Sequence, residues 1–305
     1  MGTGHGHGHV TAGGQHRGRL VGVLAITASI MVVQVIGALL SGSIALLADA
    51  GHMLTDSAGV ALALVAITLA ARPPTAKRTF GLARAEILAA AVNAAVLLGL
   101  GAYIMYESIS RLTEPPALQS GSMLVFGIIG LVGNVASMLL LFKAQNASLN
   151  MRGAFLEVVT DTLASVGVIG AALIAMFTGF TRADAIVAVL IGLLILPRAF
   201  SLLRAAVDVL LEAAPKNVDL DEVRQHILGV PHVRDVHDLH AWTVTSGMPI
   251  LSAHIVVEDE CFHDGHAPQM LDQLQTCLAG HFDVEHSTFQ LEPKSHAAHE
   301  QPVHP

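Results

Sequence analysis

Long apolar runs separated by short polar connections dominate this sequence up to about residue 200. Each run is near the ~20 residues that a helix needs to span the hydrocarbon core of a bilayer. The sixth run is the shortest and is expected to end near Pro197, because proline disrupts helical hydrogen bonding. The pattern predicts six membrane-spanning helices, at Leu20–Leu40, Ser43–Ala71, Ile87–Tyr106, Ser122–Phe142, Ala154–Phe177 and Ala183 to Leu196 or a little beyond.

From about Asp208 the apolar runs give way to shorter patterns. Helical spacing of apolar residues alternates with strand-like segments, and Asp219 is placed to cap the first helix. The order predicts a small α+β domain of αββαβ type. Its elements are a helix around Leu220–Ile227, strands at Val233–Thr245 and Pro249–Val257, a helix around Leu271–Leu278 and a strand at Thr288–Glu292.

Composition supports the same class. Of 305 residues, 53% are hydrophobic and 13% are charged, whereas a soluble domain carries about 25% charged residues. The sequence therefore predicts an α-helical membrane protein in contact with the lipid bilayer. The net charge of −8 and the scattered basic residues exclude nucleic-acid binding.

Basic residues also predict the orientation in the membrane. Ten of the 16 Lys and Arg residues, Arg198 among them, fall on the side of the chain termini, whereas Arg111 and Arg182 fall on the other side. Because cytoplasmic loops are enriched in Lys and Arg, both termini are expected in the cytosol and the protein in the inner (plasma) membrane.

Four domains follow from these patterns. The alternating Gly and His residues of the N-terminal tail either collect loosely bound metal or have no function. The predicted domains are a disordered His- and Gly-rich tail (1–18), a six-helix transmembrane domain (19–207), a cytosolic α+β domain (208–293) and a disordered tail (294–305).

Ionisable residues inside two of the apolar runs are the main candidates for chemistry. His52 and Asp56 are four residues apart, and Glu157 and Asp161 repeat that spacing a hundred residues later. Residues at this spacing share one face of a helix, and ionisable groups within membrane helices usually face a partner, a cavity or an ion. One imidazole and three carboxylates suit a divalent transition metal such as zinc.

Other polar residues within the runs have less specific interpretations. Asp49 lies on the same helical face as His52, and we expect it to orient the imidazole or to lie at the mouth of the ion path. Gln34, Asn93 and Asn134 are expected to form hydrogen bonds between helices. Asp184 falls near the end of a run, where it is expected to reach water.

The same motifs resemble those of the cation diffusion facilitator family, whose members exchange metal cations for protons. The segment Leu47-Ala-Asp-Ala-Gly-His-Met-Leu-Thr-Asp-Ser57 resembles the second membrane helix of that family, and Leu149–Asp161 resembles the approach to the fifth. Asp238-Leu-His-Ala-Trp-Thr-Val-Thr-Ser-Gly247 resembles the signature of its cytosolic domain. The resemblance, from about Arg19 to Pro293, implies a ferredoxin-like cytosolic domain that holds a homodimer together.

The resemblance also implies a regulatory metal site in the cytosolic domain. His237 and His254 match positions at which members of the family bind zinc, whereas Gln290 stands where some members have histidine. His240 and Glu292 are further candidate ligands.

The predicted function is export of zinc from the cytosol in exchange for protons. Because zinc-selective members usually have histidine where this chain has Glu157, export of manganese, cobalt, iron(II) or cadmium remains an alternative. A membrane metal sensor is a second alternative. An enzyme is not expected, since the sequence has no His-Glu-x-x-His motif and four protein ligands leave no position for a reactive water.

The predicted orientation can be tested with single cysteines at Ala76 and Ser120, which are expected on opposite sides of the membrane. We expect a membrane-impermeant thiol reagent added outside cells to label position 120 and not position 76. Labelling of position 76 with protection of position 120 would contradict the orientation. Replacing Cys261 and Cys277 by serine first removes background labelling.

Overall fold

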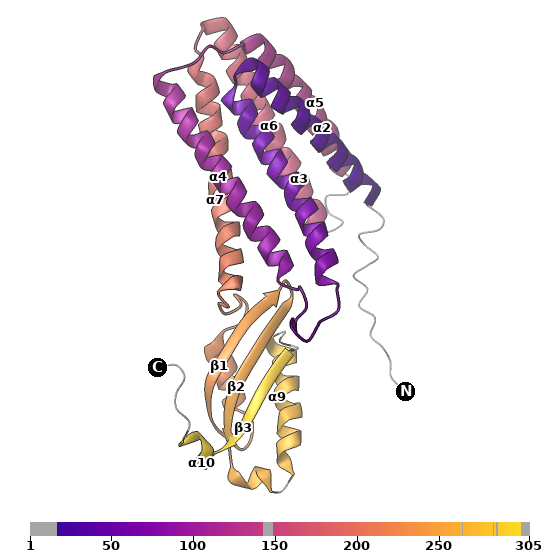
Figure 1. Ribbon diagram of the computed structural model, residues 1–305, viewed down its shortest axis with the longest axis vertical. Helices are drawn as coiled ribbons and strands as arrows, with labels where there is room; N and C mark the ends of the chain where they lie inside the picture. Colours follow the sequence, from indigo (N-terminus) through magenta and orange to yellow (C-terminus); the bar gives the residue numbers. More distant parts are fainter. Residues whose placement is uncertain (1–16, 143–148, 264, 283, 285, 300–305) are drawn as a thin grey trace. The chain divides into compact units, whose positions relative to one another are not determined.

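A computed structural model of the protein describes residues 17–142, 149–263, 265–282, 284 and 286–299 (Figure 1). Residues 1–16 of the predicted N-terminal tail and 300–305 of the C-terminal tail lie outside this part. The described chain begins with six long helices, which confirms the predicted helical bundle. They are α2 (Arg17–Ser41), α3 (Ile44–Ala70), α4 (Ala85–Thr113), α5 (Ser120–Phe142), α6 (Leu149–Thr178) and α7 (Arg182–Leu210).

Five of these helices, α2, α4, α5, α6 and α7, contain described segments long and apolar enough to cross a membrane. The remaining one, α3, has 27 residues and carries Asp49, His52 and Asp56. The chain divides into two compact units. One comprises the chain up to Leu62 and Val92–Leu202, and the other comprises Ala63–Ala91 and the chain from Leu203 onward.

Small residues and buried amides position the helices of the first unit. Helix α5 packs against α2 and α6 (Figure 1). A side chain at Gly37 or Gly133 would collide with the neighbouring helix, so glycine allows α2 and α5 to approach closely. Asn134 donates a hydrogen bond to Ser165 Oγ at 3.1 Å, and Gln34 donates one to Asp49 Oδ2 at 2.6 Å. These bonds confirm the predicted interhelical roles of Gln34 and Asn134.

Asp184 fixes the start of α3 to α7. Its carboxylate accepts hydrogen bonds from Ser43 Oγ at 2.5 Å and from the backbone N–H groups of Ile44 and Ala45 at 2.8 and 3.2 Å. The expectation that Asp184 reaches water is wrong, since its exposed fraction is 3%. A carboxylate at a helix N-terminus satisfies N–H groups that have no partner within the helix and is favoured by the helix dipole.

Helix α7 is longer than the sequence suggested. It continues through Pro197 to Leu210 instead of ending near Leu196. A proline within a helix removes one hydrogen bond without necessarily ending the helix, and membrane helices tolerate it when neighbouring groups compensate. Arg198 is therefore part of α7.

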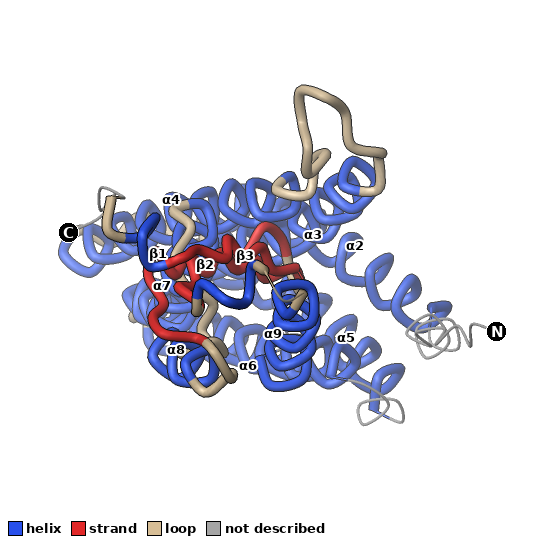
Figure 2. The backbone as a smooth tube through the Cα atoms, turned by 90° about the horizontal axis from the view of Figure 1, so that it is seen from below, coloured by secondary structure: helices blue, strands red, loops and turns tan. Residues whose placement is uncertain are grey.

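The second unit contains the small domain, whose helix–strand order is the predicted αββαβ. The antiparallel pair β1–β2 is extended by β3, which runs parallel to β2. Helices α8 and α9 share one apolar core with this sheet and lie on the same face of it (Figure 2). The elements are α8 (Leu220–Leu228), β1 (Val233–Thr245), β2 (Met248–Val257), η1 (Asp259–Phe262), α9 (His266–Phe282), β3 (His286–Pro293) and α10 (Lys294–Ala297).

Two details of the small domain concern the sequence predictions. Asp219 caps α8 as predicted, because its side chain accepts from the N–H groups of Asp221 and Glu222. The short helix α10 forms at the start of the segment that was expected to be disordered. It begins directly after Pro293, which is the last residue of β3 and the N-cap of α10.

The same unit joins the loop between α3 and α4 to the small domain. Arg84 forms an ion pair with Glu212 at 2.6 Å. Glu86 accepts hydrogen bonds from Thr245 Oγ1 at 2.9 Å and Ser246 Oγ at 3.0 Å. The start of α4 is thereby tied to the turn between β1 and β2.

Candidate metal site

The first half of the site lies on α3. Because α3 is an uninterrupted helix, His52 and Asp56 lie one turn apart on the same face. The distance from His52 Nε2 to Asp56 Oδ2 is 3.3 Å. The other ring nitrogen of His52, Nδ1, is buried and makes no hydrogen bond with the described residues. Nε2 is therefore the nitrogen that faces the carboxylates.

Helix α6 contributes the second half. Asp161 Oδ1 lies 4.0 Å from His52 Nε2. One donor atom each of His52, Asp56 and Glu157 lies within 4.8 Å of the other two. The structure thus brings together all four residues that the sequence singled out. His52 and Asp161 are 7% and 5% exposed, whereas the side chains of Asp56 and Glu157 are about a third exposed on the isolated chain.

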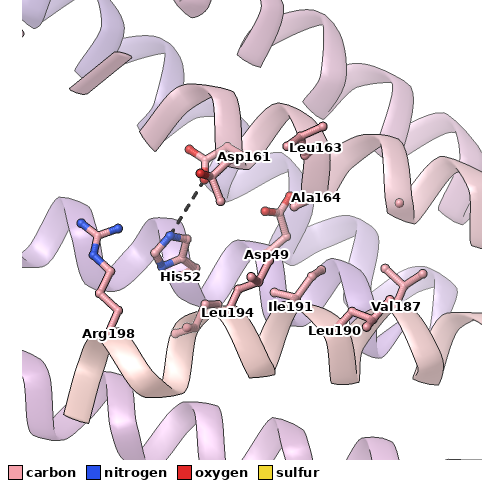
Figure 3. Close-up of a pocket in the computed structure, with 13 residues that line it drawn as sticks. Asp49, His52, Asp161, Leu163, Ala164, Val187, Leu190, Ile191, Leu194 and Arg198 are labelled. Carbon is pink, nitrogen blue, oxygen red and sulfur yellow. Dashed lines mark ion pairs between the residues drawn. The ribbon is translucent and has the colours of Figure 1, made fainter. Parts of the chain in front are cut away.

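A cavity of about 390 Å³ opens beside these residues. Asp49 and His52 from α3 and Asp161 from α6 border it, and mainly apolar side chains of α6 and α7 form the remaining wall (Figure 3). The cavity therefore has a polar end, at which the carboxylates lie, and a largely apolar wall.

Asp49 lies one turn before His52 and is 1% exposed. Its Oδ2 accepts a hydrogen bond from Gln34 Nε2 on α2, while the residue borders the cavity. Gln34 thus partly compensates the burial of this carboxylate, since a hydrogen bond offsets part of the cost of removing a charge from water.

Arg198 is a residue at this site that the sequence analysis missed. It was counted with the basic residues on the cytosolic side of the sixth apolar run. In the structure it lies on α7 and borders the cavity, and its Nη2 is 3.4 Å from Glu157 Oε1. The continuation of α7 beyond Pro197 places it there, and apolar residues on both sides of Pro197 were the available signal.

A second group of donors lies in the small domain. His237 and His254 are directly opposite each other on β1 and β2, and Glu292 is on the adjacent β3. His254 Nδ1 is 2.8 Å from Glu292 Oε1, and His237 Nε2 is 3.4 Å from Glu292 Oε2. One donor atom of each of the three lies within 4.8 Å of the others. The fourth candidate, His240, instead has its Nε2 2.9 Å from Asp238 Oδ1.

Both domains match models of known protein families. Residues 20–211 match the family model of the cation efflux transmembrane domain. Residues 215–294 match that of the cation efflux protein cytoplasmic domain.

The chain belongs to the cation efflux family. This is the cation diffusion facilitator family that the motifs resemble. As a member of the cation efflux family, the chain is a multi-pass membrane transporter of metal cations and is not an enzyme.

Three named proteins are similar in sequence to nearly the whole chain. The metal cation efflux system protein CzcD of Cupriavidus metallidurans is 47% identical over 96% of this chain and 90% of its own length. The zinc transporter ZitB of Escherichia coli is 42% identical over 90% and 87%. A cadmium, cobalt and zinc/H(+)-K(+) antiporter of Bacillus subtilis is 36% identical over 95% and 93%.

A solved structure from Cupriavidus metallidurans also matches part of the chain. The metal-bound C-terminal domain of the CzcD transporter is 42% identical. The match covers 25% of this chain and 99% of that chain, with a TM-score of 0.22.

Proposed function

We propose that this cation efflux protein exports zinc from the cytosol in exchange for protons, with His52, Asp56, Glu157 and Asp161 as the ligands of the transported ion. The convergence of these donors from α3 and α6 carries the proposal. One nitrogen and three oxygen donors suit tetrahedral zinc. The relatives named as a zinc transporter and as a cadmium, cobalt and zinc antiporter support the same substrate class.

Exchange for protons follows from the charges of the four ligands. If all three carboxylates were ionised, the empty site would carry three negative charges in an environment with little water. Mutual repulsion and desolvation therefore keep at least one proton on the empty site. A divalent cation binds by displacing protons, because metal ligands must be deprotonated. Alternation between cytosol-open and outward-open forms would then carry metal out and protons in.

The donor set also supports a second substrate range. Glu157 supplies oxygen where an imidazole would supply nitrogen, and oxygen ligands favour harder cations such as manganese and iron(II). The name of the Bacillus subtilis relative adds cobalt and cadmium. We place Asp49 beside the access path, since it borders the cavity and its Oδ2 accepts a hydrogen bond from Gln34.

The remaining features concern location and assembly. We propose that the protein lies in the inner membrane with both termini in the cytosol, on the basis of its basic loops. We further propose that the cytosolic domains of two chains form a homodimer, which the match to the cation efflux cytoplasmic domain supports. His237, His254 and Glu292 are proposed to hold a regulatory metal ion.

Replacing Asp56 or Asp161 by alanine should reduce zinc flux into proteoliposomes by more than about 100-fold, because each change removes a metal ligand. The measurement uses an imposed proton gradient and a panel of zinc, cadmium, cobalt and manganese. Glu114→Ala removes an exposed carboxylate just after the end of α4 and should transport normally. A folded Asp161→Ala protein that keeps more than about a tenth of the flux would disprove the proposed site.

Replacing Glu157 by histidine should shift selectivity toward zinc. The change removes one negative charge and replaces an oxygen donor with a nitrogen donor. We expect the ratio of zinc to manganese flux to rise about tenfold. Glu157→Gln is the matched control, since it removes the charge and keeps an oxygen donor. An unchanged metal ranking in Glu157→His would mean that Glu157 does not bind the ion.

Zinc binding in the cytosolic domain can be measured in the full chain once the transport site is disabled by Asp161→Ala. We expect the remaining bound zinc to be lost when His254 is also replaced by alanine, because His254 lies within reach of both His237 and Glu292. His296→Ala, at an exposed position on α10, should keep it. Light scattering of the same samples should give the mass of two chains. A mass of one chain would refute the proposed homodimer. Equal zinc binding in all variants would refute the proposed regulatory site.

A further inference from the structure

Arg198 introduces a permanent positive charge beside the proposed transport site. Its Nη2 lies 3.4 Å from Glu157 Oε1, and it borders the same cavity as Asp49, His52 and Asp161. In Figure 3 its side chain extends from α7 on the side of His52. The proposed transport mechanism assigns no role to this residue.

The charge of Arg198 is permanent and lies at the site. A guanidinium does not lose its proton in proteins, and this one pairs with Glu157 and borders the same cavity as His52 and Asp161. In the described part of the chain, no other arginine or lysine forms an ion pair with any of the four proposed ligands. Arg198 is therefore the nearest source of compensation when no metal is bound.

Charge balance indicates what this arrangement achieves. Three ionised carboxylates, a neutral imidazole and a divalent cation leave one negative charge, and Arg198 brings the loaded site to neutrality. An uncompensated charge in a membrane helix is costly. In the empty site, the positive charge of Arg198 offsets the negative charge of Glu157. A neutral histidine at position 157 would add no charge.

We propose that Arg198 is the internal counter-cation of the transport site, paired with Glu157 when the site is empty and displaced from that carboxylate by the arriving metal. This inference rests on the proposed role of Glu157 as a ligand. Because guanidinium and metal compete for the same oxygens, Arg198 weakens metal binding and favours release. Transport requires such a limit on affinity, since an ion that binds too tightly does not leave its site.

The test measures zinc affinity and flux in the full-length protein carrying Arg198→Gln or Arg198→Met, two neutral variants of different polarity. At mildly alkaline pH, where protons compete least, competition with a zinc chelator should show about five- to tenfold tighter binding in detergent. In proteoliposomes the half-saturating zinc concentration and the maximal flux should both fall. Arg198→Lys retains the charge and should lie closer to the wild type.

Two controls separate this role from a merely structural one. Arg204→Gln removes an exposed positive charge from the same helix and should leave zinc affinity unchanged. In a Glu157→Gln background, Arg198→Gln should have little further effect, because the competing pair no longer exists.

The outcomes distinguish this inference from the proposed function. Unchanged or weaker zinc binding in both neutral variants, with binding at the transport site still lost in Asp161→Ala, would overturn the role of Arg198 and leave the transport site intact. Normal transport-site binding in Asp161→Ala would overturn both. Equal effects of Arg198→Gln in the wild type and in Glu157→Gln would show that Arg198 does not act through Glu157.

Discussion

Repulsion among three carboxylates in an apolar helix bundle is the constraint on which this structure depends. Asp56, Glu157 and Asp161 lie together with His52 between α3 and α6. Ionised carboxylates in a membrane interior are costly, and the cost rises when they are close together. The arrangement is stable only if protons, a metal ion or a fixed cation balances the charge. Under the proposed function, the same requirement couples metal binding to proton release.

The position of α3 is determined by polar contacts that also need compensation. At its start, Asp184 of α7 accepts bonds from Ser43, Ile44 and Ala45. One turn before His52, Asp49 accepts a bond from Gln34 of α2. Such contacts are directional, and breaking one leaves a buried polar group without a partner. They therefore hold α3 in one register against two neighbouring helices, which the non-directional packing of apolar side chains does not ensure.

The small domain uses the same donor types under a different constraint. There the sheet places His237 opposite His254, and the parallel strand β3 brings Glu292 beside them. Glu292 is 1% exposed, and His254 Nδ1 and Gln290 Nε2 each lie 2.8 Å from its Oε1. A metal ion would meet one carboxylate here and three in the helix bundle. Sites of such different charge are expected to differ in affinity and to permit separate roles in transport and regulation.

The sequence by itself determined the number and order of the long helices, the αββαβ order of the small domain and the two pairs of candidate ligands. It could do so because hydrophobic periodicity and the four-residue spacing are properties of a single helix or strand. His52 with Asp56, and Glu157 with Asp161, share a face of their own helices whatever surrounds them.

Tertiary structure decided which faces meet. How the helices pack determines the approach of α3 to α6, the burial of Asp184 and the hydrogen bond from Gln34 to Asp49. No local pattern in the sequence specifies a distance between elements that are far apart in the chain. The pairing of Arg198 with Glu157 further required that α7 continue through Pro197. A proline changes local helix stability by a limited amount, and contacts with neighbouring helices determine whether the helix continues.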